Sequence, residues 1–309
     1  MRDRCPFCND DRVIESIKAS ERMFGLEGTF IYRQCANCGS LYLDDPTLNL
    51  APFYPDTYYS YAGTERPKLA GLFEDLNSRV KAKTFVSFLR RSGVNVDAST
   101  RFIDVGSGSG DLLRALRALG LSHVMGIDPY LRAGVETNGI PVMRGSIESV
   151  AEGDDRPQSD VVMFHHSLEH VVDPEGSLRA AAQLLAPGGA ILVRIPIVSY
   201  AWERFGVNWV GLDAPRHLAI PTQRGFEQLA MRLGLRIAAC RYDSTSTQFV
   251  ASEAIERGLT LTNAFPSNPP RTAMRAVLSI PKSLHAKRLN AQRRGDQAAF
   301  TLVRSTDVA

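Results

Sequence analysis

The chain has 309 residues, 44% hydrophobic and 22% charged, which suits one large globular domain with a small appendage or two modest domains. It has no run of about 18 apolar residues and no apolar segment at the N-terminus, so we expect neither a transmembrane helix nor a signal peptide. The net charge of +3 excludes little by itself. We therefore expect a cytoplasmic protein, in which cysteines are thiols or metal ligands.

Four of the five cysteines lie in an N-terminal module, residues 1–45. They form two C-x2-C pairs separated by 26 residues, Cys5 with Cys8 and Cys35 with Cys38. Each pair can direct two thiolates at one tetrahedral ion, and four thiolates close its coordination shell. The pattern predicts a structural Zn²⁺ site rather than a catalytic one, although the gap is longer than the usual window. The alternative is four cysteines that only pack in a core.

Residues 46–98 combine a loop with a helical segment. The loop is broken by prolines and rich in tyrosine, including Tyr58, Tyr59 and Tyr61. Apolar residues then recur at helical spacing over residues 66–92. We expect this region to cover the active site, with packing between domains as the alternative role of the tyrosines.

Apolar runs typical of strands alternate with helical segments from residue 101 to residue 242. The expected strands are 101–105, 123–127, 141–144, 160–165, 190–195 and 236–242, and the expected helices are 111–119, 132–137, 175–185 and 222–233. This alternation predicts an α/β fold with a doubly wound, mostly parallel sheet. A seventh strand at 296–304 completes the sheet, and residues 244–309 thus comprise a capping insertion and this final strand.

A glycine-rich turn, "DVGSGSG", joins the first expected strand to the first helix. Gly106 and Gly108 fit the dinucleotide-binding fingerprint, but the third glycine is displaced to Gly110. Asp104 stands at the carboxyl end of the strand, where its charge would repel a pyrophosphate and favour a cationic ligand. The turn therefore favours a nucleotide-like ligand without phosphates.

Asp128 ends the second expected strand, 22 residues after Gly106. An acidic side chain at this place can accept hydrogen bonds from ribose hydroxyls. A ligand with a ribose, an ammonium group and no phosphate is S-adenosylmethionine (SAM).

The motifs "DVGSGSG" and "GIDP", followed by "SDVVMFHHSLEHVVDPEGSLRAAAQLLAPGGAILVRIP", strongly resemble class I SAM-dependent methyltransferases. The resemblance covers roughly residues 100–240, so residues 99–243 are the expected SAM-binding core. It implies that the methionine part of SAM is lined by Asp104, Gly106, Ser107, Gly108 and Gly110. It also implies that Asp128 holds the ribose, that Pro129 packs near the adenine, and that Ser146 and Ile147 border the adenine ring.

Together, the cysteine module, the aromatic segment and the SAM domain resemble bacterial methyltransferases that act on sugars and surface polysaccharides. Some of these are C-methyltransferases of nucleotide-activated deoxysugars. This chain is shorter and does not show their large additional C-terminal domain, so we expect O-methylation of a sugar hydroxyl. The sugar would be nucleotide-linked, lipid-linked or part of a polysaccharide.

Three of the six histidines lie in "FHHSLEH", at the carboxyl end of the fourth expected strand. Ligands bind at this edge of such sheets, and in related sugar methyltransferases the "EH" pair faces the acceptor. We therefore expect His170 to be the general base and Glu169 either to orient it or to bind the acceptor, with His166 beside the methyl group. The alternative is that His170 caps a turn.

A second block, "PRH", follows the fifth expected strand and resembles a segment that faces the acceptor in relatives. His217 is accordingly a second candidate base. Arg216 would bind an anionic acceptor, or else pair with a carboxylate in a structural turn.

Residues 258–295 contain no Asp or Glu but seven Lys or Arg residues. We expect this stretch to be a solvated surface or to contact acceptor phosphates or an anionic membrane surface, which would place the protein at the inner face of the membrane. Two other functions stay open, an RNA methyltransferase of the ribosomal-RNA type and a non-catalytic SAM-binding protein. Mixed charges in residues 1–45 argue against nucleic acid.

Overall fold

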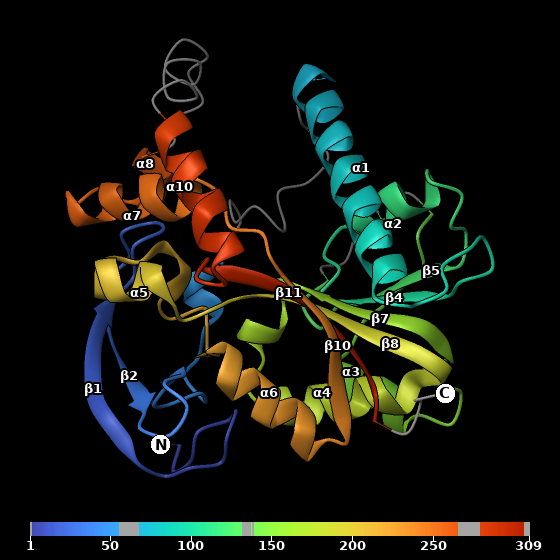
Figure 1. Ribbon diagram of the computed structural model, residues 1–309, viewed down its shortest axis with the longest axis horizontal. Coiled ribbons are helices and arrows are strands. Elements are labelled where there is room, and N and C mark those ends of the chain that lie inside the picture. Colours follow the sequence, from blue (N-terminus) through green and yellow to red (C-terminus); the bar gives the residue numbers. More distant parts are fainter. Residues whose placement is uncertain (1, 56–67, 132–136, 138, 265–278, 306–309) are drawn as a thin grey trace.

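The computed structural model describes residues 2–55, 68–131, 137, 139–264 and 279–305 (Figure 1). Some sequence-based expectations fall outside these ranges. They concern Tyr58, Tyr59, Tyr61, nearly all of the expected helix at 132–137, Arg271 and Arg275.

A seven-stranded sheet forms the centre of the molecule, in the strand order β10-β11-β8-β7-β4-β5-β6. Its strands are β4 (Phe102–Val105), β5 (Val124–Ile127), β6 (Val142–Met143), β7 (Ser159–His165), β8 (Leu185–Pro196), β10 (Leu235–Tyr242) and β11 (Gln297–Arg304). β11 is antiparallel to both of its neighbours, whereas the pairs from β8 to β6 are parallel. The expected mostly parallel, doubly wound sheet is confirmed.

Helices cover both faces of this sheet (Figure 1). One face carries α1 (Lys68–Arg91) and α2 (Asp111–Arg117), and the other carries α3 (Ile147–Glu152), α4 (Pro174–Leu184) and α6 (Gln223–Arg232). Side chains of one strand alternate between the two cores: Val161 and Met163 pack with α1 and α2, whereas Val162 and Phe164 pack with α3 and α4. This double burial explains why the strand sequences are almost continuously apolar.

The N-terminal module builds a second, four-stranded sheet. Its order is β1-β2-β3-β9, with β1 (Val13–Ser20), β2 (Thr29–Cys35), β3 (Leu41–Leu43) and β9 (Ala219–Ile220). The first three strands belong to the module, but β9 comes from the segment that links β8 to α6. The module is therefore joined to the segment between β8 and α6 by backbone hydrogen bonds as well as by packing.

A helical cap lies beside the N-terminal module, above one end of the large sheet (Figure 1). It consists of α5 (Tyr200–Phe205), α7 (Thr247–Glu256), α8 (Leu261–Ala264) and α10 (Ile280–Ala291). Phe249 and Leu289 of the cap share a core with Phe30 of β2 and with Trp209, which is 1% exposed. Trp209 is therefore an anchor of this core.

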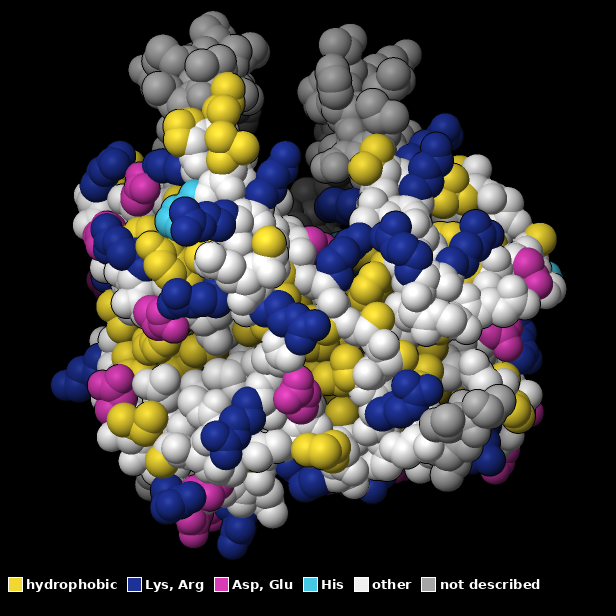
Figure 2. Space-filling view, in the orientation of Figure 1, with side chains coloured by type: hydrophobic (Ala, Val, Ile, Leu, Met, Phe, Trp, Pro, Cys, Tyr) yellow, Lys and Arg dark blue, Asp and Glu magenta, His cyan; other side chains and the backbone are white. Residues whose placement is uncertain are grey.

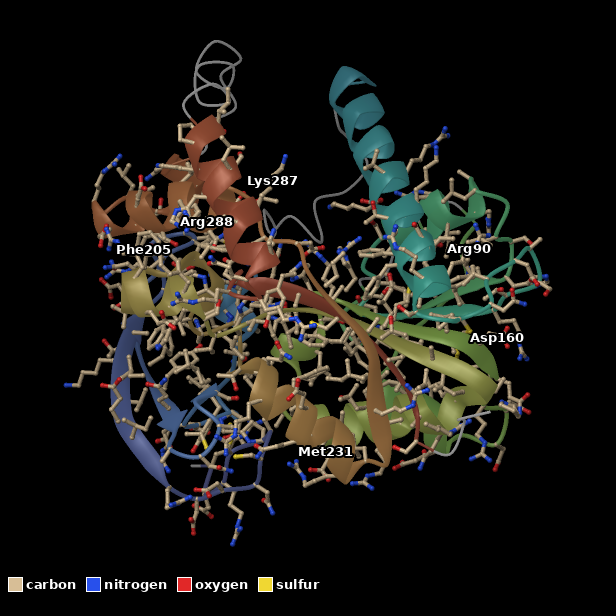
Figure 3. The ribbon with its side chains drawn as sticks, in the orientation of Figure 1. Arg90, Asp160, Phe205, Met231, Lys287 and Arg288 are labelled. Carbon is tan, nitrogen blue, oxygen red and sulfur yellow. The ribbon has the colours of Figure 1, made fainter. Side chains whose placement is uncertain are left out.

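Basic side chains are spread over the face of the cap seen in Figure 2, interspersed with acidic and apolar ones. Lys287 and Arg288 are exposed on α10 (Figure 3). Lys282 instead pairs with Glu253 at 2.5 Å, so part of the positive charge of this stretch is neutralised by α7. Within the described part of the chain, no helix is both long and apolar enough to cross a membrane.

Candidate functional site

The glycine turn lies at the carboxyl end of β4, at the edge of the sheet where ligands bind in such folds. Gly106 has φ +76°, a conformation that side chains other than glycine rarely adopt. A Cβ atom at Gly106 would also lie 2.6 Å from the Cβ of Ser167, which follows β7. The turn therefore packs directly against the segment that carries the histidines.

Asp104 is buried beside this turn, and its Oδ1 has no hydrogen-bond partner among the described residues. Burial, together with the neighbouring Asp128 carboxylate, raises the pKa of Asp104 to about 8. Ser107 Oγ also lacks a partner in the described part of the site. A buried carboxylate without a donor is suited to a ligand that brings an ammonium group.

Asp128 closes the other side of the turn. Its Oδ2 accepts a hydrogen bond from the Gly108 N–H at 2.8 Å, and its Oδ1 accepts one from the Tyr130 N–H at 2.8 Å. The Asp128 carbonyl accepts a bond from Gly145 N–H at 3.3 Å, which brings the start of α3 next to the turn. Each Asp128 oxygen keeps acceptor capacity for a further donor such as a ribose hydroxyl.

The expected adenine-side residues lie at the same edge of the sheet. Ser146 is the N-cap of α3 and accepts a bond from Ser149 N–H at 3.3 Å, so its hydroxyl already has a structural partner. Ile147 is buried in the core, and Pro129 is exposed next to Asp128. The structure thus brings Asp104, the glycine turn, Asp128 and the start of α3 together.

His170 and His217 form the centre of the second half of the site, with ring centroids 4.7 Å apart. His170 lies in the short helix η2 (Leu168–His170), and its Nδ1 is 2.9 Å from the Arg216 carbonyl oxygen. His217 Nδ1 is 2.8 Å from the Gly211 carbonyl oxygen. Because a carbonyl only accepts, both Nδ1 atoms carry a proton, and Nε2 is the nitrogen that each ring has left to offer a ligand.

Glu169 completes this group, and its side chain is 0% exposed. Its Oε1 is 3.2 Å from His166 Nδ1 and 4.0 Å from His217 Nε2, whereas Oε2 has no partner within the described ranges. The other ring nitrogen of His166 contacts the Arg194 guanidinium, so His166 Nδ1 donates to Glu169. His166 therefore orients Glu169, while His165 packs against Phe85 as a core residue.

Glu169, His170 and His217 therefore converge at this point: each offers one ligand atom that lies within 4.8 Å of those of the other two. Among the described residues, no donor is bound to Nε2 of either histidine or to Glu169 Oε2. Burial, with His217 nearby, lowers the pKa of His170 to about 4 and keeps the ring neutral. Such a group can accept protons or hydrogen bonds from a ligand.

Tyr54 belongs to the site but was not predicted. It follows the short helix η1 (Ala51–Phe53), and its hydroxyl lies 3.2 Å from His170 Nδ1. Its ring stacks on Tyr130 with centroids 6.4 Å apart, so it spans from Asp128 to the histidines. The density of tyrosines around Pro55 was the signal that could have identified it.

Arg216 has no exposed side-chain surface and makes two ion pairs, to Asp213 at 2.6 Å and to Glu21 at 2.7 Å. Of the two roles left open for it, the structure shows the pairing with carboxylates rather than a free cation facing an acceptor. Asp213, three positions before Arg216, is a carboxylate of the same turn, as that alternative implied. Glu21 was not predicted, because no local sequence pattern links it to Arg216, 195 positions away.

The four cysteines converge as the spacing predicts, with every sulfur within 4.8 Å of the others. Cys5 Sγ lies 3.6 Å from Cys38 Sγ, and Cys8 Sγ lies 3.4 Å from Cys35 Sγ. Sulfurs around a tetrahedral zinc are roughly 3.8 Å apart, since Zn–S bonds are about 2.3 Å. The donor set and spacing thus fit Zn²⁺. Cys240 is free and only partly buried on β10.

A methyltransferase-domain family model matches residues 66–239. The chain is 36% identical over 131 residues to a ubiquinone biosynthesis O-methyltransferase from Ruegeria pomeroyi, covering 38% of this chain and 51% of that protein. A protein of the same name from Cupriavidus pinatubonensis is 34% identical over 137 residues, covering 41% of this chain and 54% of that protein. The chain therefore spans about half the length of the curated relatives it matches.

Solved structures with a similar fold include a putative sarcosine dimethylglycine methyltransferase from Galdieria sulphuraria. It has a TM-score of 0.46 and 17% identity, and the match covers 74% of this chain and 86% of that one. A SAM-dependent methyltransferase from Archaeoglobus fulgidus has a TM-score of 0.44 and 16% identity, with 72% and 93% covered.

Proposed function

This chain belongs to the methyltransferase-domain family, and we propose that it is a SAM-dependent methyltransferase that methylates a hydroxyl of a saccharide, with His170 as the general base. The observation that carries the proposal is the convergence of three acceptor atoms without a donor, on His170, His217 and Glu169. Hydroxyl groups supply the missing donors, and a sugar offers several on adjacent carbons.

The residues at the carboxyl end of β4 suit SAM. Asp104, buried and without a donor, would bind the ammonium group, and the turn from Gly106 to Gly110 would follow the methionine chain. Asp128 would accept hydrogen bonds from the ribose hydroxyls. SAM supplies a methyl group that its positive sulfur already activates, so the protein must mainly position the acceptor and remove its proton.

The acceptor hydroxyl would donate its hydrogen bond to His170 Nε2. As the oxygen forms its bond to the methyl carbon and the sulfur–carbon bond breaks, the proton passes to this nitrogen. The Arg216 carbonyl then still accepts from Nδ1–H, so the charged ring keeps its hydrogen bond. Glu169 Oε2 and His217 Nε2 would accept from a neighbouring hydroxyl and fix the sugar's orientation.

Two further assignments accompany this function. We propose that Cys5, Cys8, Cys35 and Cys38 hold one structural Zn²⁺, as their sulfur spacing supports. The acid-free stretch that includes α10 would contact phosphates of a nucleotide-linked or lipid-linked acceptor, with the exposed Lys287 and Arg288 as contacts.

A second candidate acceptor is a phenolic hydroxyl. It is favoured by the O-methyltransferases of ubiquinone biosynthesis that match this chain. A pair of adjacent phenolic hydroxyls would present the same donors to Glu169 and His170 as two hydroxyls of a sugar.

Methyl transfer from SAM labelled with ¹³C in the methyl group separates these candidates. The acceptor panel contains sugar nucleotides, free saccharides, their deoxy analogues, catechols and amines. We expect a ¹³C-methoxy product from a saccharide and none from the analogue that lacks the reacting hydroxyl. A catechol methyl ether as the main product would select the second candidate, and a carbon- or nitrogen-bound label would contradict O-methylation.

The pH dependence of kcat/KM for the acceptor, measured at saturating SAM, tests the base. The low pKa of His170, about 4, means that the ring stays neutral throughout the neutral range. We expect kcat/KM to be flat down to about pH 5 and to fall only as the pH drops through about 4. An acid limb near the reference value of about 6.5 would contradict the assignment to His170.

A further inference from the structure

The carbonyl that fixes His170 belongs to a residue held by the N-terminal module. Arg216 accepts the Nδ1–H bond of His170 through its backbone, while its guanidinium is buried. Two guanidinium nitrogens donate to Asp213, one of them donates to Glu21 at 2.7 Å, and NH1 donates to the Phe53 carbonyl at 3.1 Å. Every side of this guanidinium thus has an acceptor.

Glu21 is itself fixed from several directions. It follows β1 and is 3% exposed. Its carboxylate oxygens accept hydrogen bonds from four consecutive backbone N–H groups at distances of 2.7 to 3.0 Å. The donors are Met23, Phe24, Gly25 and Leu26. The negative charge on Glu21 is therefore stabilised by the N–H groups of the turn that follows it as well as by Arg216. The turn alone holds the carboxylate in place, independently of its contact with Arg216.

The same module also binds the backbone of the segment that carries His217. Tyr32 on β2 donates its hydroxyl hydrogen to the His217 carbonyl at 2.8 Å. Leu218 N–H donates to the Glu169 carbonyl at 2.7 Å, and the Leu218 carbonyl accepts from Leu43 N–H of β3 at 2.8 Å. Hydrogen bonds from β2 and β3 thus reach the backbone of His217 directly and that of Glu169 through Leu218.

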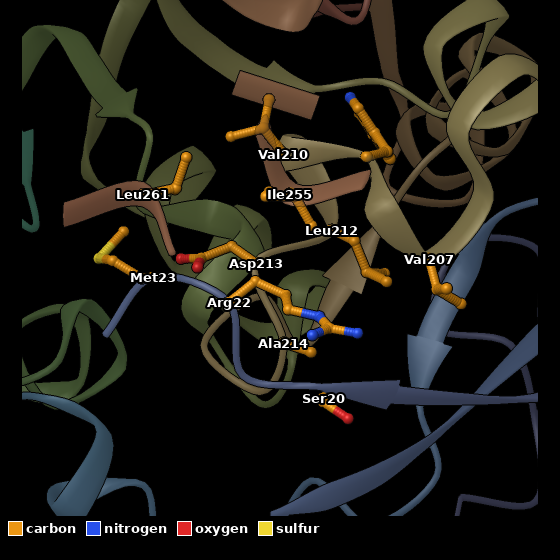
Figure 4. A pocket seen from close by; sticks show the side chains of 11 residues that line it. Ser20, Arg22, Met23, Val207, Val210, Leu212, Asp213, Ala214, Ile255 and Leu261 are labelled. Atoms are coloured by element: carbon orange, nitrogen blue, oxygen red, sulfur yellow. The ribbon is translucent and has the colours of Figure 1, made fainter. Parts of the chain in front are cut away.

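Figure 4 shows where the three parts of the molecule meet behind this loop. Ser20 and Met23 of the module line one small pocket together with Asp213 of the loop and Ile255 of the cap. Asp213 has φ +35°, a left-handed conformation that non-glycine residues rarely adopt. The loop bearing His217 is therefore shaped by contacts from outside the SAM-binding core.

We propose that Glu21 is a positioning residue for the methyl transfer: it holds Arg216 so that the Arg216 carbonyl keeps His170 protonated on Nδ1 and free on Nε2. The proposal rests on the proposed function of His170 as the base. It gives the N-terminal module a role in the reaction, because without this carbonyl the proton can move to Nε2. A ring in that tautomer cannot take a proton from the acceptor hydroxyl.

The test compares Glu21→Gln with Asp44→Asn in the full-length, metal-loaded protein. Asp44 pairs with Arg33 at 2.6 Å in the same module but makes no contact with Arg216 or the histidines in the described structure, so it controls for lost stability. Two-bond ¹H–¹⁵N spectra of ¹⁵N-histidine protein report the His170 tautomer, and rates are taken per folded molecule. A second variant, Glu21→Asp, which keeps the charge but shortens the side chain, serves if Glu21→Gln does not fold.

We expect wild type and Asp44→Asn to show His170 protonated on Nδ1. Glu21→Gln should show a mixture of tautomers, with kcat lower by about 10- to 100-fold and SAM affinity unchanged. An unchanged tautomer, or wild-type kcat in folded Glu21→Gln, would overturn the proposal. The tautomer is read without turnover, so failure of His170 as the base would be recognised separately, by full activity of a His170 variant.

Discussion

Replacing His170 by alanine should lower kcat by about 10²- to 10⁴-fold, the usual contribution of a positioned general base. The variant loses the ring whose Nδ1 proton is held by the Arg216 carbonyl, so that its Nε2 is left to take the acceptor proton. The dissociation constant for SAM should stay within about twofold, because Asp104 and Asp128 are untouched. Steady-state kinetics and isothermal titration on the same preparation check both numbers.

His123→Ala is the matched control for this variant. His123 is exposed and precedes β5, at the opposite end of the strands from the site, so its loss should leave kcat unchanged. Full turnover by His170→Ala, with normal SAM binding, would remove His170 from the mechanism. A matching loss in His217→Ala alone would transfer the role of base to His217.

Replacing Cys38 by serine should abolish zinc binding and unfold the N-terminal module. Structural zinc in small domains contributes an apparent free energy of about 10–16 kcal/mol, so its loss exceeds what the module's small sheet can compensate. The Cys38 carbonyl also accepts from the Thr222 hydroxyl at 2.6 Å, at the N-cap of α6. We expect zinc content to fall from about one per chain to none and the Tm to fall by roughly 10 °C or more.

Cys240→Ala is the control, because this thiol lies on β10 and outside the cluster. It should keep its zinc. Wild-type protein that binds no zinc with its thiols reduced would contradict the assignment, as would a Cys38→Ser variant that has an unchanged Tm.

The sheet could be predicted because each buried strand is a short run of apolar residues and each helix has apolar residues at helical spacing. The helix expected at 222–233 is α6, and Thr222 is its N-cap, whose hydroxyl accepts from Gly225 N–H at 3.0 Å. The strand at 190–195 was predicted too short: β8 begins at Leu185, because pairing with Ser159 extends it through the proline and glycines. Pairing across strands is not visible in a local pattern.

The candidate site could be predicted only where a residue lies at or soon after the carboxyl end of a strand. Asp104 lies near the end of β4, Asp128 follows β5, and the "EH" pair lies in η2 after β7, so the structure brings them to one edge of the sheet. Glu21 could not be found in this way, because its partner Arg216 lies far along the chain and the contact depends on β3 pairing with the two residues of β9. A strand of two residues is too short to show an alternation of apolar and polar residues in the sequence.

The affinity for SAM as a function of pH tests the central claim, that a buried Asp104 carboxylate receives the ammonium group of SAM. Its pKa of about 8 means that the free protein carries a proton there at neutral pH and must release it on binding. Isothermal titration should show affinity rising by about tenfold per pH unit from about pH 6 to about pH 7.5, with proton release. Asp104→Asn should bind weakly with no such slope. A SAM affinity that does not depend on pH, or no SAM binding at all, would contradict the account.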